Sequence, residues 1–337
     1  MNELHLQDKF MIPFFRDNLG YKEVKANTVT NSLIIEEDLQ EFISNTELNK
    51  KPYEALLKKY HGNQAQLLKE LIDLIQDRIA SNRNMALFIN NNKTITLNGV
   101  KLNLFYPSGS IIHEDKLFKQ NIFSVIQELP YKYKYQGSQI YSFRPDLTFF
   151  VNGIFLGYSE LKSNYTNQTA SKNGRGKVIK DYFEAVRVYF ETFDRNQMLS
   201  ENEKQNYRKD FLKIFEKAIH ISTTDLEETY VIRTISDYFD DILSTCREGK
   251  YDREEISKRI EGIFKPYPLL NPFAQKKDKL VELFTAHYSK SNIEKEILYY
   301  NFIEREVYEI NGSKEFKKEA GRLISPRPKQ KFGTDKI

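Results

Sequence analysis

The sequence has a single cysteine, Cys246, among its 337 residues, so no disulfide can form within the chain. Disulfides are typical of oxidising compartments and rare in the reducing cytosol. The lack of a cysteine pair therefore agrees with a cytoplasmic protein.

Long apolar stretches are also missing. No run of about 18 apolar residues occurs, which is the length at which a transmembrane helix becomes a candidate. The residues from Met1 to Asp8 contain neither a basic region nor an apolar core, so we expect no signal peptide. The sequence thus predicts no membrane partner.

Two common ligand-binding motifs are absent. The five histidines lie too far apart in the sequence for a zinc-ligand spacing: His5, His61, His113, His220 and His287. No G-x-x-x-x-G-K-[ST] motif occurs, and the nearest segment, Gly174 to Lys177, lacks both the spacing and the Ser or Thr. The chain therefore has no P-loop for a nucleotide.

The excess of positive charge is small. Lys and Arg number 51 against 47 Asp and Glu, a net charge of +4, which is too mild to establish nucleic-acid binding. A local basic surface would have to attract DNA. The contents of 40% hydrophobic and 29% charged residues are typical of a globular protein.

Periodicity predicts several elements. Apolar residues spaced by three and four positions predict an amphipathic helix over 64–79 and another over 177–193. The run Leu87 to Ile89 predicts the start of a β section, and Asn98-Gly99 predicts a hairpin turn. We also expect a helix over 292–309.

Prolines suggest a domain boundary. Pro266, Pro268 and Pro272 form a stiff joint. We therefore expect one domain over residues 1–265 and a mainly helical segment over 266–337.

The most informative stretch runs from Arg144 to Lys162. Two apolar, β-rich runs flank Asn152-Gly153, the strongest short-range signal for a hairpin. Asp146 lies at the start of this hairpin, and Glu160 and Lys162 lie at its end. Two carboxylates this close favour a divalent cation with oxygen ligands. Lys162 shares a strand face with Glu160 because side chains alternate with period 2.

The whole stretch, RPDLTFFVNGIFLGYSELK, resembles the nuclease motif of the restriction (R) subunit of type I restriction enzymes, which belong to the PD-(D/E)xK nuclease superfamily. The resemblance implies an α/β fold with mixed α+β character, in which helices flank a central mixed sheet. It also implies Mg²⁺-dependent hydrolysis of phosphodiester bonds in double-stranded DNA. Asp146, Glu160 and the Leu161 carbonyl would hold the metal. Lys162 would orient the attacking water or neutralise charge at the phosphorus.

Further residues follow from the same resemblance. Many related nucleases carry another acid on the first helix; Glu3 and Asp8 are the candidates, and we favour Asp8. They also carry Gln-x-x-x-Tyr on the helix after Glu-x-Lys. Tyr182 matches that tyrosine, but Val178 stands at the glutamine position, which puts the DNA contact of this helix in doubt. Tyr182 contacts DNA or packs in the core, and the sequence favours neither. Lys172, Arg175 and Lys180 are the remaining candidates for DNA binding.

The C-terminal residues resemble the R-subunit segment that precedes the helicase motor. There a glutamine reads the adenine of ATP, and Gln330 matches it. We therefore expect the chain to be an N-terminal part of a longer, ATP-dependent translocase that works with methyltransferase and specificity subunits in phage defence. A standalone protein is the alternative.

Asp146 and Glu160 can share a metal only if their side chains lie on the same face of the hairpin. With a plain two-residue turn and a regular ladder, Asp146 would pair with Ser159 and point away from Glu160, because a one-residue slip reverses every side chain. A shared metal therefore requires an odd irregularity between Asp146 and Glu160. A three-residue loop, Asn152 to Ile154, would provide it, and a bulge or strand end near Asp146 is the alternative.

Three functions fit the sequence. The first is the endonuclease module of a type I R subunit. The second is a module that binds DNA or other subunits and has a vestigial nuclease site. The third is a standalone repair or phage-defence nuclease of the same superfamily.

Overall fold

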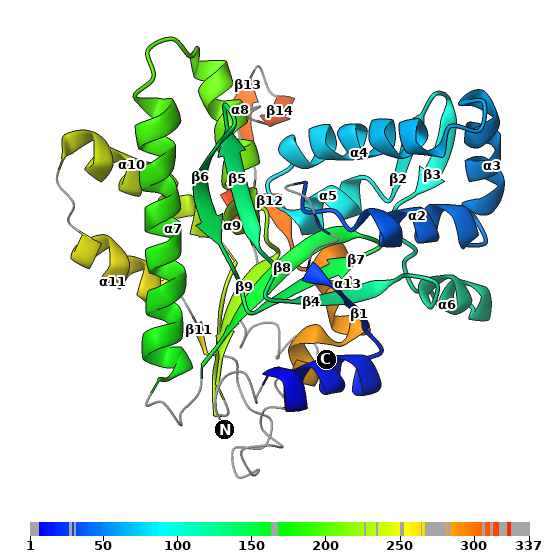
Figure 1. Ribbon diagram of the computed structural model, residues 1–337, viewed down its shortest axis with the longest axis horizontal. Helices are drawn as coiled ribbons and strands as arrows, with labels where there is room; N and C mark the ends of the chain where they lie inside the picture. The colour runs from blue at the N-terminus through cyan, green and yellow to red at the C-terminus, as the bar shows by residue number, and fades with distance from the viewer. Residues whose placement is uncertain are drawn as a thin grey trace.

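The protein is built on a seven-stranded mixed sheet, seen in a computed structural model (Figure 1). The structure describes residues 7–26, 29, 32–162, 168–225, 227–233, 235–249, 253–263, 265–266, 281, 284–304, 307–310, 313–316 and 322–324. The strands lie in the order β1 (Lys22–Val24), β4 (Phe123–Gln127), β7 (Leu147–Val151), β8 (Ile154–Leu161), β9 (His220–Thr224), β10 (Thr229–Ile232) and β11 (Lys265–Pro266). The pairs β1–β4 and β8–β9 are parallel and the others antiparallel. The expected α/β class with a central mixed sheet is confirmed.

The two central strands are covered on both faces. Every residue of β7 and β8 is buried, as their nearly continuous apolar sequence requires. One face of the sheet carries the helices that follow β8, namely α7 (Arg175–Tyr189), α8 (Glu201–Phe211), α9 (Lys213–Glu216), α10 (Phe239–Glu248) and α11 (Arg253–Ile263). On the opposite face, Phe149 of β7 packs against Phe15 and Tyr288, with ring centroids 5.0 and 4.2 Å away. The sheet is therefore the middle layer of the molecule.

The N-terminal helices gather at one end of the sheet (Figure 1). They are α2 (Glu36–Asn45), α3 (Lys50–Lys59), α4 (Gln64–Ala80), α5 (Met85–Asn91) and α6 (Ile112–Phe118). The short η1 (Gln7–Met11) and η2 (Phe14–Asn18) precede them, and η5 (Ala170–Gly174), η6 (Phe190–Asp194) and η7 (Ile235–Tyr238) lie later in the chain. The helices predicted over 64–79 and 177–193 are confirmed by α4 and by α7 with η6.

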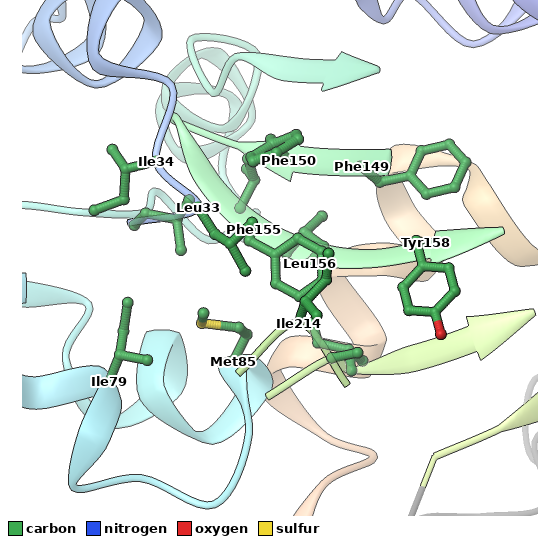
Figure 2. Packing of buried hydrophobic residues seen from close by; sticks show 14 of the residues in the cluster. Leu33, Ile34, Ile79, Met85, Phe149, Phe150, Phe155, Leu156, Tyr158 and Ile214 are labelled. Carbon is green, nitrogen blue, oxygen red and sulfur yellow. The ribbon is translucent and has the colours of Figure 1, made fainter. Parts of the chain in front are cut away.

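The β section predicted from Leu87 is wrong, because these residues lie in α5. The Asn84 side chain accepts a hydrogen bond from the Leu87 amide and caps the helix. The first five residues of α5 are buried, so the helix has no long polar stripe, and a short apolar run of this kind does not distinguish a buried helix from a strand. Figure 2 shows Met85 of α5 on the side of β8 where Leu156 and Ile214 also lie.

Four two-stranded sheets complete the described part. They are β2 (Thr94–Leu97) with β3 (Val100–Asn103), β5 (Tyr131–Tyr135) with β6 (Ser138–Phe143), β12 (Phe302–Glu304) with β15 (Arg322–Ile324), and β13 (Val307–Ile310) with β14 (Ser313–Phe316). The predicted turn at Asn98-Gly99 is confirmed, and both residues have positive φ, 47° and 76°.

The helix predicted over 292–309 is too long. The helix α13 (Lys290–Leu298) ends where the amides of Tyr299 and Tyr300 both donate to the Lys295 carbonyl. The Asn301 side chain then donates to the Glu296 carbonyl at 2.7 Å, and β12 and β13 follow. The α13 helix packs against α5, and the domain boundary near residue 265 stays a prediction.

None of the helices in the described ranges has both the length and the apolar character needed to cross a membrane.

Candidate active site

The central hairpin turns in two residues. Val151 pairs with Ile154, and the residues between them, Asn152 and Gly153, have φ of 51° and 79°. Two positive φ values in succession are the geometry of a type I′ turn, for which Asn-Gly is favoured. The three-residue loop proposed from the sequence is therefore wrong.

Asn152 fixes this turn in place. Its side chain accepts from the Ile122 amide at 2.8 Å and donates to the Leu104 carbonyl and to Oδ1 of Asn121, at 2.8 and 2.9 Å. A side chain on Gly153 would meet the Ile35 carbonyl at 2.4 Å. The turn is thus held too closely to accommodate an additional residue.

The irregularity lies instead within β8. Phe150 pairs with Phe155, but Phe149 pairs with Gly157, so Leu156 is the additional residue of a β-bulge. Figure 2 shows Leu156 in the buried cluster with Phe150 and Phe155. The sequence predicted an irregularity of an odd number of residues between Asp146 and Glu160, and this prediction is confirmed. The bulge lies between the two positions proposed for it, which were the turn and the strand end near Asp146.

The bulge brings the two acids into register. Beyond it, Leu147 pairs with Ser159, and one step further along both strands Asp146 comes opposite Glu160. Their proximity is also evident in the electrostatics, because the charge of Asp146 raises the pKa of Glu160. The expected pair of carboxylates therefore meets at one end of the hairpin.

Each acid has a distinct environment. Oδ2 of Asp146 accepts a hydrogen bond from the Leu161 amide at 2.6 Å. The Glu160 residue is 0% exposed, and its Oε2 accepts from Nζ of Lys177. Its Oε1 is buried and has no hydrogen-bond partner among the described residues. Burial and then the Asp146 charge raise the pKa of Glu160 to about 8, although Lys177 and Lys162 act in the opposite direction.

Lys162 lies at the same end of the strand. Its amide donates to the Thr224 carbonyl of β9 at 2.8 Å, and its Nζ donates to the Leu161 carbonyl at 2.7 Å. Lys162 is only 6% exposed, so its position is fixed by packing as well as by hydrogen bonds. The structure therefore brings together Asp146, Glu160, Leu161 and Lys162.

Sequence reasoning missed two residues of this cluster, Lys177 and Asp181 of α7. Nζ of Lys177 bonds Glu160 and lies 4.0 Å from Oδ2 of Asp181. Burial raises the pKa of Asp181, against the effect of Lys177. The i, i+4 spacing of the two residues was visible in the sequence, but it does not tell which face of α7 meets the sheet.

The predicted DNA contacts fall into two groups. Lys172 and Lys180 are exposed. Arg175 is half-buried, and its guanidinium lies 4.6 Å from the Tyr230 ring and donates to the Glu261 carbonyl at 3.3 Å. Tyr182 is fully buried, and its hydroxyl donates to Oε1 of Glu216 at 3.0 Å. The packing alternative therefore fits Tyr182 better than a contact with DNA.

Two further candidates stay predictions. Asp8 belongs to η1 (Gln7–Met11), and its role as an accessory acid is untested. Gln330, the candidate adenine reader, lies outside the described residues.

The donor set suits a hard cation. Among the described residues no group of three or more His, Cys, Asp or Glu side chains could hold a metal. Mg²⁺, however, commonly binds one or two carboxylates and keeps several waters. Asp146, Glu160 and the Leu161 carbonyl match that pattern, and the unbonded Oε1 of Glu160 is a buried oxygen that a cation would satisfy.

Comparison with protein-family models identifies the family of this chain. The family model of the type I restriction enzyme R protein N terminus matches residues 1–207. No curated protein matches the chain.

Proposed function

Because the chain belongs to the family of type I restriction enzyme R protein N termini, we propose that it is the Mg²⁺-dependent endonuclease module of such an R subunit. The observation that carries the proposal is the bulge at Leu156, which places Asp146 opposite Glu160. Without the bulge the two carboxylates would lie on opposite faces of the hairpin.

The residues that would hold Mg²⁺ are Asp146, Glu160 and the carbonyl of Leu161. The bound ion would supply Lewis-acid chemistry, which makes water a better nucleophile and offsets charge that develops on the phosphate. The amide of Leu161 orients the Asp146 carboxylate by its bond to Oδ2. The backbone of β8, the strand that carries Glu160, thus also orients the Asp146 carboxylate that precedes β7.

Two lysines would act on the phosphate. Lys162 is held at the strand end by the carbonyls of Leu161 and Thr224, where its ammonium orients a water molecule or neutralises charge at the phosphorus. Lys177 bonds Oε2 of Glu160, and its ammonium would lie beside a phosphate bound at the two carboxylates, where it would offset negative charge.

The partners follow from the same proposal. The substrate is double-stranded DNA in the cytoplasm, and the assembly includes methyltransferase and specificity subunits for phage defence. ATP would act through a motor domain and would not bind to the described part of this chain.

One observation favours a second function. The ion pair between Lys177 and Glu160 occupies one of the two carboxylate oxygens of Glu160. A module that binds DNA or other subunits with a vestigial nuclease site would have the same pair permanently. A standalone nuclease has no observation of its own in its favour.

Nicking of supercoiled plasmid with Mg²⁺ and with EDTA tests the proposal. The wild-type chain should nick only with Mg²⁺, and Asp146→Asn and Glu160→Gln should abolish nicking, whereas Glu201→Gln, whose side chain is 80% exposed, should not. In parallel, calorimetry with Mn²⁺ should give binding that either acid substitution removes. Metal binding without nicking would support the vestigial site, and unchanged Mn²⁺ binding in both acid variants would contradict the metal site.

A further inference from the structure

The strands β5 and β6 form a ribbon that leads directly into the candidate site. One face of this ribbon is aromatic and buried. The Tyr133 ring lies 4.9 Å from that of Phe211, and its hydroxyl donates to Oδ2 of Asp210 at 2.7 Å. The Tyr131 hydroxyl donates to the Phe211 carbonyl at 3.1 Å. The ribbon is therefore anchored on α8 and presents its other face to solvent.

The exposed face is basic and polar. Residues 131–144 contain three basic residues and no acidic one, and Lys132, Lys134 and Arg144 are all exposed. Side chains two residues apart on a strand are about 7 Å apart, so the two lysines form a row along the ribbon. Arg144, at the end of the ribbon, lies 3.8 Å from Oε1 of Glu128.

A second bulge shapes this face. Tyr133 pairs with Tyr141, but Lys134 pairs with Gln139, so one additional residue lies in β6. In a regular strand, residues three positions apart point to opposite faces. Because of the bulge, Gln139 and Ser142 are both exposed on the face that carries the lysines. Hydrogen-bonding side chains therefore flank the lysines.

The ribbon is joined to the site on two sides. Arg144 precedes Asp146 by two residues, and the Phe143 ring lies 5.9 Å from Nζ of Lys177. The Tyr141 hydroxyl donates to the Asp181 carbonyl of α7 at 3.1 Å, next to the exposed Lys180. Figure 1 shows the ribbon beside α7 and rising from the sheet. A polyanion that reached the two carboxylates would pass along this face.

We propose that the exposed face of the β5–β6 ribbon is the duplex-binding surface of this module. Lys132 and Lys134 bind backbone phosphates and align the strand to be cut with Asp146 and Glu160. The inference rests on the proposed function and adds the element that binds its substrate. A two-stranded ribbon has the width that a DNA groove admits, and phosphate contacts position a protein without reading the sequence, as a subunit that leaves recognition to a partner requires.

Fluorescence anisotropy with a short labelled duplex in EDTA tests the surface without cleavage. Lys132→Gln/Lys134→Gln should weaken binding and reduce the slope of log K against log salt by about 1.8, since each phosphate contact contributes about 0.9. The matched control, Lys50→Gln/Lys51→Gln, removes the same charge from exposed positions of α3, far from the ribbon in Figure 1. It should leave the slope unchanged, and Lys132→Arg/Lys134→Arg should bind like wild type.

Three outcomes would overturn the inference. They are equal losses in the ribbon and α3 variants, no loss in either, or tighter binding of a single strand with the same dependence on the ribbon lysines. Equal losses would mean that the lysines act only through net charge. Calorimetry with Mn²⁺ on the ribbon variant separates this inference from the proposed function, because the metal should still bind when the DNA surface is impaired.

Discussion

Lys177 of α7 donates a hydrogen bond to Oε2 of Glu160 on β8, from 17 residues further along the chain. Glu160 is fully buried, whereas the Lys177 side chain is 38% exposed. Once Glu160 is ionised, above its pKa of about 8, the ammonium compensates for a carboxylate that has left water, while itself remaining partly hydrated.

At about pH 9, where Glu160 is ionised, Lys177→Met should destabilise the chain in EDTA by about 1 kcal/mol. The value is well below that for breaking a fully buried ion pair, because Lys177 is partly solvated and Glu160 can take up a proton. In Glu160→Gln/Lys177→Met most of this loss should be recovered, since no buried charge is left alone. Urea denaturation of the four proteins gives the coupling energy. Lys180→Met is the control on the same helix, and strictly additive effects of the two changes would show that the pair is not coupled.

Lys162→Met should reduce Mg²⁺-dependent nicking by at least about 10²-fold, a loss typical of removing one group that acts on the reacting centre. Methionine keeps the buried stem of Lys162, so the thermal midpoint and Mn²⁺ binding should stay near those of wild type. Nicking assays, circular dichroism melts and calorimetry measure the three quantities. Cleavage within a few-fold of wild type would remove Lys162 from the proposed mechanism.

Gly157→Ala should destabilise the chain by about 1–3 kcal/mol, as expected for overpacking against a backbone that cannot retreat. A Cβ at this position would lie 2.3 Å from the carbonyl oxygen of His220 on β9. The control is Gly176→Ala in α7, where a Cβ would have no neighbour within 4 Å. That change should stabilise the helix by about 0.5–1 kcal/mol. Urea denaturation of both variants checks the signs, and similar effects of the two would contradict the close β8–β9 contact.

The stability of the chain should depend on pH because the amine of Lys217 is buried. Burial lowers its pKa from the ordinary value of 10.5 to about 8, and its Nζ bonds the Asn82 carbonyl. At a pH between the folded-state pKa of about 8 and the unfolded-state pKa of 10.5, Lys217 is protonated in the unfolded chain but not in the folded chain. The free energy of unfolding therefore rises with pH in this range. From about pH 7.5 to about pH 9.5 the gain should be about 2 kcal/mol.

Denaturation of wild type and Lys217→Met at both pH values isolates this contribution, because other titrating groups cancel in the difference. Lys217→Met should lack the gain. An equal pH dependence of the two proteins would mean that Lys217 keeps its ordinary pKa in the fold.

The sequence by itself determined the strands of the central hairpin, the position of its turn at Asn152-Gly153, though not the turn's length, and the amphipathic helix α4. Each depends on a local pattern. Two short β-rich apolar runs on either side of Asn-Gly, whose residues tolerate positive φ, predict the hairpin, and apolar residues spaced by three and four positions predict the helix. It also determined that an irregularity had to separate Asp146 from Glu160, because the alternation of side chains admits no other way to bring them together.

Only the tertiary structure decided where that irregularity lies. Asn152 bonds Ile122, Leu104 and Asn121, which lie in other parts of the chain, and this keeps the turn to two residues. With the turn held to two residues, the additional residue lies within β8, at Leu156. No local pattern of the hairpin sequence marks Leu156 as that residue.

The tertiary structure likewise decided which residues of α7 meet the acids. The sequence gives the apolar stripe of a helix, but not the rotation and height at which the stripe docks on a sheet. That docking buries Tyr182 against Phe215 and brings Lys177 onto Glu160. Local patterns determined the elements of this site, whereas long-range packing determined which charges face one another, because packing joins residues that are distant in the sequence.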